Sequence, residues 1–240
     1  MKPATAAQLI GINHQFYQTF ASHFSVTRQR LQPGVRMLLE RISPAANLLD
    51  LGCGNGELAR ELARRQHKGR YVGLDYSAEL LAEASQGLSP TLNAAFYQRD
   101  LAVPGWDKAL PSSPFDNIMA FAVLHHLPGE DTRLEVLQAV RRNLAPQGMF
   151  FHSNWLFLNS PRLRLRIQPW EKAGIAPEEV DPGDYLLDWR QGGYGFRYVH
   201  LFSEEELARL ANQSGFKVAD SFFSDGENGR LGLYQAWAPE

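Results

Sequence analysis

Glycines and acidic residues concentrate in a short stretch that follows a run of apolar residues. Residues 48–58 read Leu-Leu-Asp-Leu-Gly-Cys-Gly-Asn-Gly-Glu-Leu. Within this stretch one acid is followed by three glycines: Asp50, Gly52, Gly54 and Gly56. Leu58 and Leu62 then recur at helical spacing, which predicts a strand, a tight loop and a helix N-terminus. Because glycine has no Cβ and the first N–H groups of a helix are unpaired, such a loop can approach a ligand closely.

The spacing of these glycines separates two nucleotide-like ligands. A dinucleotide fingerprint, G-x-G-x-x-G, would need glycine at position 57, where this chain has Glu57. Carboxylates at Asp50 and Glu57 would repel a pyrophosphate, whereas a ligand with an ammonium group would tolerate or use one. The loop therefore favours S-adenosyl-L-methionine as the cofactor and argues against a nicotinamide oxidoreductase.

Two further acids follow predicted strands. Residues 71–74 form an apolar strand that ends at Asp75, and residues 95–98 lead to Asp100 and Leu101. The carboxyl ends of parallel strands share one edge of a sheet, where ligands bind. Asp75 is therefore expected to accept from ribose hydroxyls, while the Asp100 carboxylate and the Leu101 N–H contact an adenine edge.

Two adjacent histidines follow the next strand. Residues 115–123 are largely apolar, as expected for a parallel strand buried on both faces, and they run into His125 and His126. No metal site is predicted, because adjacent side chains diverge and no acidic or histidine cluster accompanies them. One histidine is expected to line an acceptor pocket, with His125 favoured, and the other to be a structural hydrogen-bonding residue.

Helical patterns precede the glycine loop, over about residues 5–42, and predict a helical N-terminal cap at residues 1–43. Tyr17 and Arg28 belong to a polar group near the end of the first of two helices. This group fits an ordinary solvated helix terminus. It also fits a lid in which Tyr17 and Arg28 reach the cofactor's methionyl carboxylate, since the arginine fork matches a carboxylate.

The regular alternation of strands and helices stops after a fifth predicted strand at residues 149–154. The chain then holds a basic stripe, Arg162 to Arg166, and an acidic stretch from 173 to 189. Composition alone fits a solvated lobe of mixed charge. Its place beyond the ligand edge makes residues 156–200 a candidate insertion on the substrate side.

The last segment predicts a closing hairpin, with strands at residues 216–223 and 231–237 joined by an Asn-Gly turn. The expected architecture is one α/β domain over residues 1–240. It is a three-layer sandwich around a seven-stranded, mostly parallel, doubly wound sheet, with the N-terminal cap and the insertion after strand five.

Composition limits the partners and the compartment. The chain has 24 basic and 26 acidic residues, a formal net charge of -2, so no overall field attracts nucleic acid or an anionic membrane. Cys53 is the one cysteine, which excludes an internal disulfide or a cysteine-based metal framework. No signal sequence or long apolar run is recognised. We expect a cytoplasmic protein with no membrane partner.

As an ordered set, D-x-G-x-G, Asp75, Asp100-Leu101 and the hairpin resemble the class I S-adenosylmethionine-dependent methyltransferases over about residues 45–155 and 201–238. The resemblance implies strand order 3-2-1-4-5-7-6 with the seventh strand reversed. The residues expected around the cofactor are Tyr17, Arg28, Asp50, Gly52, Gly54, Gly56, Asp75, Tyr76, Asp100, Leu101 and Ala122.

A narrower resemblance rests on three motifs: His23-Phe24-Ser25-Val26-Thr27-Arg28, His125-His126 and Arg197-Tyr198-Val199-His200. They are similar to the H-F-S-x-T-R, H-H and R-Y-Y-H patterns of eukaryotic enzymes that esterify carboxymethyl groups on wobble uridines of tRNA. The resemblance implies that His125, Arg197 and His200 face the acceptor and that Arg28 holds the cofactor carboxylate. Val199 replaces the second tyrosine of the pattern.

The acceptor stays open between tRNA and a small molecule. A carboxylate acceptor needs orientation by Arg197 rather than a base, because it is already ionised near neutral pH. A hydroxyl or amine acceptor would need a base, for which His125 or His200 is the available type. A different class of function is a non-catalytic cofactor-binding subunit with a small protein partner. Oligomeric state is not predicted.

Overall fold

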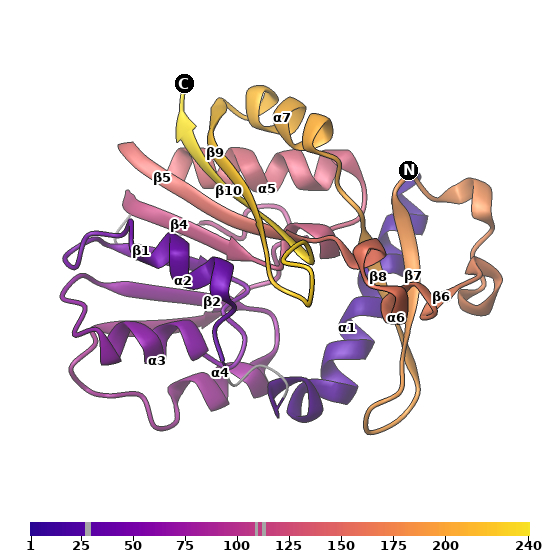
Figure 1. Cartoon of the computed structure of the whole chain (residues 1–240), viewed down its shortest axis with the longest axis horizontal. Coiled ribbons are helices and arrows are strands. Elements are labelled where there is room, and N and C mark those ends of the chain that lie inside the picture. Colours follow the sequence, from indigo (N-terminus) through magenta and orange to yellow (C-terminus); the bar gives the residue numbers. More distant parts are fainter. Residues whose placement is uncertain (27–29, 109, 112–113) are drawn as a thin grey trace.

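A seven-stranded sheet forms the centre of the computed structural model (Figure 1). The structure describes residues 1–26, 30–108, 110–111 and 114–240, and within these ranges it describes the side chains of all residues except 21–26. Its strands are β1 (Leu48–Leu51), β2 (Tyr71–Asp75), β3 (Ala94–Gln98), β4 (Phe115–Phe121), β5 (Leu144–Trp155), β9 (Phe216–Ser224) and β10 (Gly232–Pro239). They are ordered β3-β2-β1-β4-β5-β10-β9, with β1 to β5 parallel and β10 antiparallel to both of its neighbours. With β9 and β10 as the sixth and seventh strands, the predicted order and reversal are confirmed.

Helices lie on both faces of this sheet, as Figure 1 shows. The α-helices of the described ranges are α1 (Pro3–Val26), α2 (Pro33–Leu39), α3 (Glu57–Arg64), α4 (Ala78–Ser85), α5 (Glu130–Asn143), α6 (Pro161–Arg164) and α7 (Glu204–Gln213), of which α1 and α6 lie beside the second sheet described below. One apolar cluster joins the sheet to α5 and α7 through Leu137 and Leu207, and a second joins it to α2 and α3 through Leu38 and Leu62. The predicted three-layer α/β sandwich is therefore confirmed.

The join between α5 and β5 differs from the sequence expectation. The helix ends at Asn143 and the strand begins at Leu144, before Pro146. Pairing with β4 shifts register between Phe115 and Asn117. Proline cannot donate to a ladder, so it is accommodated in this irregular part of the strand.

The chain between β5 and α7 forms a second, three-stranded antiparallel sheet. Its strands are β6 (Ile167–Gln168), β7 (Asp184–Trp189) and β8 (Gly195–His200), in the order β6-β7-β8. Short 3₁₀ helices accompany it and the His-His turn: η1 (Leu124–His126), η2 (Phe157–Asn159), η3 (Trp170–Ala173) and η4 (Pro177–Glu179). Figure 1 shows α1 running beside this sheet.

The Asn13 side chain fastens α1 to β8. Its Oδ1 accepts from the Tyr198 N–H at 2.8 Å, and its Nδ2 donates to the Tyr198 carbonyl at 3.2 Å. The cap and the insertion thus contact each other through backbone-like hydrogen bonds. None of the helices in the described ranges combines the length and apolarity that a membrane crossing needs.

Candidate active site

A cavity of about 640 Å³ lies at the carboxyl ends of the central strands. A volume of this order suits a nucleoside-sized ligand. The sequence-predicted residues that line it are Tyr17, Asp50, Gly52, Gly54, Asp75, Tyr76, Asp100, Leu101, Ala122, His125 and Arg197. Gly56 and His200 do not line it, and Arg28 lies outside the described residues.

The glycine loop has the conformation that the sequence predicts. Gly52, Gly54 and Gly56 have φ of 68°, 55° and 80°, which favours glycine at each position. A Cβ on Gly52 would lie 2.6 Å from the Val123 side chain, whereas one on Gly54 would meet no atom within 4 Å. Gly54 is therefore the glycine that leaves backbone open towards the cavity.

Gly56 serves the fold rather than the cavity. It is the N-cap residue of α3, and a Cβ there would lie 2.7 Å from the Cβ of Ala84 on α4. Its missing side chain lets two helices approach, so the placement of Gly56 beside the ligand is corrected.

Asp75 joins the end of β2 to the glycine loop. Its Oδ2 accepts from the Gly54 N–H and its Oδ1 from the Ser77 N–H, both at 2.9 Å. Burial raises the pKa of this carboxyl, although the backbone hydrogen bonds oppose the rise. Each carboxylate oxygen can accept more than one hydrogen bond, so acceptor capacity remains for ligand hydroxyls.

Asp50 lies deeper, under the loop. Its side chain is buried and its Oδ2 accepts from the Tyr71 hydroxyl at 2.6 Å. Burial raises the pKa of Asp50 to about 7, with the Tyr71 hydrogen bond opposing the rise and the charge of Asp75 adding to it. At neutral pH the carboxyl is therefore balanced between its two forms and can respond to a nearby cation.

Asp100 is reached by α1, through a histidine that the sequence reasoning missed. His14 Nε2 lies 3.2 Å from Asp100 Oδ2, and its ring stacks on Tyr76 with centroids 4.4 Å apart. The hydrogen bond to His14 lowers the pKa of Asp100, although burial alone would raise it. His14 precedes Tyr17 by three residues, so the helical face shared with Tyr17 was the signal that could have found it.

His125 and His126 both line the cavity, and their hydrogen-bond partners indicate which ring nitrogen carries the hydrogen when the ring is neutral. His126 Nδ1 lies 3.2 Å from the Tyr198 carbonyl, and its Nε2 lies 2.9 Å from the Tyr17 hydroxyl. A carbonyl only accepts, so Nδ1 carries the hydrogen and Nε2 accepts in the neutral ring. His125 Nδ1 accepts from the Trp155 N–H at 3.4 Å, which leaves the hydrogen of its neutral ring on Nε2.

Arg197 stands at the cavity wall among aromatic rings from three other elements. Its guanidinium carbon lies 4.7 Å from the ring centre of Trp155, 5.3 Å from that of Phe16 and 5.9 Å from that of Trp189. Cation–π packing stabilises a guanidinium and restricts its motion. The arrangement suits a group that must present a fixed fork to an anion.

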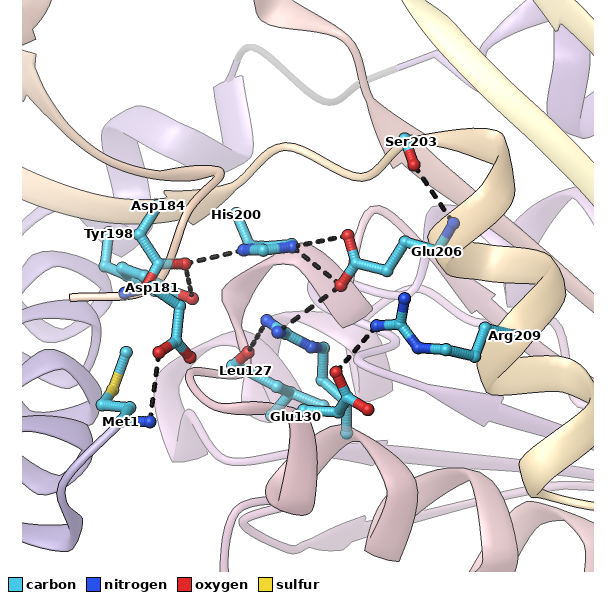
Figure 2. Close-up of polar contacts among 11 residues, drawn as sticks. Met1, Leu127, Glu130, Asp181, Asp184, Tyr198, His200, Ser203, Glu206 and Arg209 are labelled. Atoms are coloured by element: carbon cyan, nitrogen blue, oxygen red, sulfur yellow. Dashed lines mark hydrogen bonds and ion pairs between the residues drawn. The ribbon is translucent and has the colours of Figure 1, made fainter.

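His200 is not at the cavity, which corrects its placement beside the acceptor. Successive side chains of a strand point to opposite faces, so His200 lies on the face of β8 opposite to Arg197. Figure 2 shows its ring between two carboxylates: Nδ1 lies 2.6 Å from Asp184 Oδ1, and Nε2 lies 3.0 Å from Glu206 Oε2. It is 2% exposed.

The end of β5 supplies cavity residues that the sequence reasoning did not name. Asn154 and Trp155 line the cavity, and the buried Oδ1 of Asn154 has no hydrogen-bond partner among the described residues. An unsatisfied buried carbonyl is costly. The rule that placed Asp75 and Asp100 at strand ends could have found both residues.

Position 122 should accept glycine with little change in stability, whereas valine there should destabilise the fold. Its φ of 58° is left-handed, which strains an alanine and strains a β-branched residue more. In urea unfolding, Ala122→Gly is expected to stay within about 1 kcal/mol of wild type, because strain relief offsets the added freedom of the unfolded chain. Ala122→Val is expected to lose about 2 kcal/mol or more.

Ala82→Val is the matched control for this prediction, because Ala82 is an exposed alanine on α4. Valine there should cost only about 0.5 kcal/mol of helix propensity. Equal losses of stability in the two valine variants would contradict the strain at Ala122.

Comparisons with known proteins identify the family of this chain. The chain matches the model of a methyltransferase domain family over residues 23–221. It is 28% identical over 225 residues to a tRNA (carboxymethyluridine(34)-5-O)-methyltransferase of Schizosaccharomyces pombe, covering 86% of this chain and 89% of that protein. It is 38% identical over 116 residues to a trans-aconitate 2-methyltransferase of Azoarcus sp., covering 48% of this chain and 42% of that protein.

A solved structure shares the fold. The Burkholderia thailandensis 1,6-didemethyltoxoflavin-N1-methyltransferase, with bound S-adenosylhomocysteine, has a TM-score of 0.66 and 20% identity, covering all of this chain and 91% of the other. The family model spans most of the sequence, including the glycine loop and the strand-end acids. The chain therefore belongs to the methyltransferase domain family, and its cofactor is S-adenosyl-L-methionine.

Proposed function

We propose that this enzyme methylates a carboxylate, with the carboxymethyl group of a wobble uridine in tRNA as the leading acceptor. The observation that carries the proposal is the guanidinium of Arg197, held by three aromatic rings at the cavity wall. The Schizosaccharomyces pombe relative, matched over most of both chains, acts on such a uridine by its name.

One glycine and three acidic residues of the cavity have the properties that the cofactor requires. The Gly54 backbone and the balanced carboxyl of Asp50 suit the methionyl part, and Asp75 keeps acceptor capacity for ribose hydroxyls. Asp100 and Leu101 line the part of the cavity that we assign to adenine. When bound, the cofactor supplies an electrophilic methyl group, and the chain's own task is alignment and exclusion of water.

The histidines favour an acceptor that needs no base. Neutral His126 has both ring nitrogens engaged, and neutral His125 carries its hydrogen on Nε2. His125 would then act as a hydrogen-bond donor rather than as a base, and a carboxylate can use such a donor. Arg197 would hold the same carboxylate in two hydrogen bonds, since a carboxylate is ionised near neutral pH.

An RNA acceptor also needs contacts with phosphates. Arg30 and Arg162 line the cavity and are exposed, and Arg164 lies on the same short helix as Arg162. They offer a local basic rim on a chain whose net charge is -2. Such contacts make binding weaken as salt concentration rises.

Incubation with methyl-labelled cofactor tests the acceptor. One reaction contains bulk tRNA and a second contains a panel of small carboxylates that includes trans-aconitate. We expect label in tRNA that survives acid and is released by mild base, which is the behaviour of an ester. Label in the small carboxylates alone would overturn the tRNA proposal while leaving carboxylate methylation in place.

A small carboxylate is the second candidate acceptor, supported by the relative named trans-aconitate 2-methyltransferase and by the near-neutral charge. A third outcome is that the purified chain binds S-adenosylhomocysteine but transfers no methyl group until a partner subunit is added. We place the reaction in the cytoplasm, since the single buried Cys53 suits a reducing compartment.

A further inference from the structure

A buried polar network lies outside the cavity and joins the insertion to α5 and α7, two helices that pack on the main sheet (Figure 2). His200, on β8, contacts Asp184 of β7 through Nδ1 and Glu206 of α7 through Nε2. Arg133 of α5 approaches Glu206 at 3.6 Å. The Tyr198 hydroxyl donates to Asp184 at 2.8 Å. Three elements, β7, β8 and α7, therefore meet at one imidazole ring, and α5 joins them through Glu206.

The same network reaches the cavity through two backbone carbonyls. The Tyr198 carbonyl accepts from His126 and from Asn13, so its position sets both the His-His turn and α1. The Leu127 carbonyl, one residue beyond that turn, accepts from Arg133 Nη1 at 3.2 Å. A shift of β8 or of Arg133 would therefore move the wall of the cavity.

The chemistry of the two contacts requires two protons on the ring. Ionised carboxylates only accept hydrogen bonds, and a neutral imidazole has a single N–H to donate. With both carboxylates ionised, only an imidazolium satisfies Asp184 and Glu206 together. Removing one proton would leave one buried carboxylate without that donor, which is costly.

The titratable groups around the ring support a charged state. Burial opposes the charge, but the hydrogen bonds to Asp184 and Glu206 outweigh it and raise the pKa of His200. The hydrogen bond and the charge of His200 in turn lower the pKa of Glu206, against the effect of burial. The charges of Arg133 and Arg209 also lower the pKa of Glu206, and the charge of Arg133 opposes the rise in the pKa of His200. The Met1 amino group pairs with Asp181 at 3.1 Å.

We propose that doubly protonated His200 is a positioning residue for methyl transfer, which ties β8 to α7 and so places His126 and α1 at the cofactor cavity. Loss of one ring proton removes one of the two hydrogen bonds that the ring donates, so β8 is held less firmly to α7 and the cofactor binds more weakly. The inference rests on the cofactor site alone and is independent of the acceptor, so it can fail or hold whichever acceptor is used.

Two measurements test it on the full-length protein. Nitrogen NMR of the histidine rings should show both His200 nitrogens protonated, with a titration midpoint above that of a free histidine. Calorimetry with S-adenosylhomocysteine should show affinity falling by about threefold or more as pH rises through that same midpoint, as linkage requires. The effect of Asp50 has the opposite sign, because its ionisation around pH 7 favours a cationic ligand.

Glu206→Gln removes one carboxylate and should move both the NMR midpoint and the affinity step to lower pH. His200→Gln should abolish the affinity step. His67→Gln is the matched control, since His67 is a buried histidine whose Nε2 contacts the Ala46 carbonyl far from this network. Asp181→Asn controls for the Met1 amino group, and both controls should keep the step.

Circular dichroism at each pH reports whether every variant is folded. A His200 ring with a single proton below neutral pH, or an affinity step that survives in His200→Gln, would overturn the proposal. If His200→Gln does not fold, the shift of the NMR midpoint and of the affinity step in Glu206→Gln tests the proposal alone. This variant should fold, because the Glu206 side chain is partly exposed and glutamine has the same shape as glutamate.

Discussion

Replacing Arg197 with lysine is expected to lower kcat/KM for the carboxylate acceptor by about 10- to 100-fold. Lysine keeps the charge but loses the planar fork that holds a carboxylate in two hydrogen bonds, and it packs less well against Trp155. Affinity for S-adenosylhomocysteine should change by less than about threefold, because the loss lies on the acceptor side of the cavity. Steady-state kinetics with calorimetry on the same preparation measures both quantities.

Arg162→Lys is the matched control for this prediction. Arg162 also lines the cavity, but it is exposed and lies on α6. Its replacement should lower kcat/KM by no more than about threefold, as expected for a solvated charge. Equal effects at the two positions, or a loss of cofactor affinity in Arg197→Lys, would show that Arg197 does not orient the acceptor.

The cofactor side of the site was predictable because strand topology brings its residues together. Asp75 and Asp100 lie far apart from Asp50 in sequence, yet parallel neighbouring strands place their carboxyl ends at one edge. Glycine at positions 52, 54 and 56 permits the left-handed backbone that the loop adopts, since few other residues take that conformation. Gly56 does not line the cavity, because one sequence motif combines glycines that border the cavity with one that lets α3 and α4 approach each other.

The acceptor side was less predictable, because residues 156–200 carried no sheet pattern in their sequence that fixed which face each residue takes. Arg197 and His200 sit three apart on β8, so a strand must place them on opposite faces. The sequence motif alone groups Arg197 with His200 and does not show that they point to opposite faces. Once β8 is known, alternation separates Arg197 at the cavity from His200 in the buried network.

Contacts between distant segments were beyond sequence reasoning. His14 meets Asp100 and Asn13 hydrogen-bonds to β8 because α1 packs against both β8 and α4. No local pattern states which strand a helix will meet. The protonation of His126 depends on the Tyr198 carbonyl and the Tyr17 hydroxyl, which come from two other segments.

Asp50→Asn is expected to stabilise the cofactor-free protein as pH rises. The folded protein holds the pKa of Asp50 at about 7, against 3.8 for the ordinary side chain. Below pH 3.8 the carboxyl is protonated in both the folded and the unfolded state, so it does not lower the free energy of unfolding. Between the two values folding takes up a proton, so stability falls by about 1.4 kcal/mol per pH unit and levels off above about pH 7.

Asparagine cannot ionise, and its Oδ1 can still accept from the Tyr71 hydroxyl. The variant's advantage in free energy of unfolding should therefore grow from about pH 4 to about pH 7, by up to about 4 kcal/mol. Urea unfolding across this range measures it, with Asp131→Asn, at an exposed acid on α5, as the control. A difference that stays constant with pH would show that Asp50 ionises normally in the folded protein.

The same carboxyl should couple proton release to cofactor binding. A cationic ligand favours the ionised form of Asp50, so binding near neutral pH should release a fraction of a proton. Calorimetry in buffers of different ionisation enthalpy measures the net number of protons released. The contribution of Asp50 is the difference between wild type and Asp50→Asn, and this difference should fall towards zero above about pH 8. Tyr71→Phe removes the hydroxyl that stabilises the carboxylate and should raise the pKa, moving the release to higher pH. Proton release unchanged in Asp50→Asn would place the responsible group elsewhere.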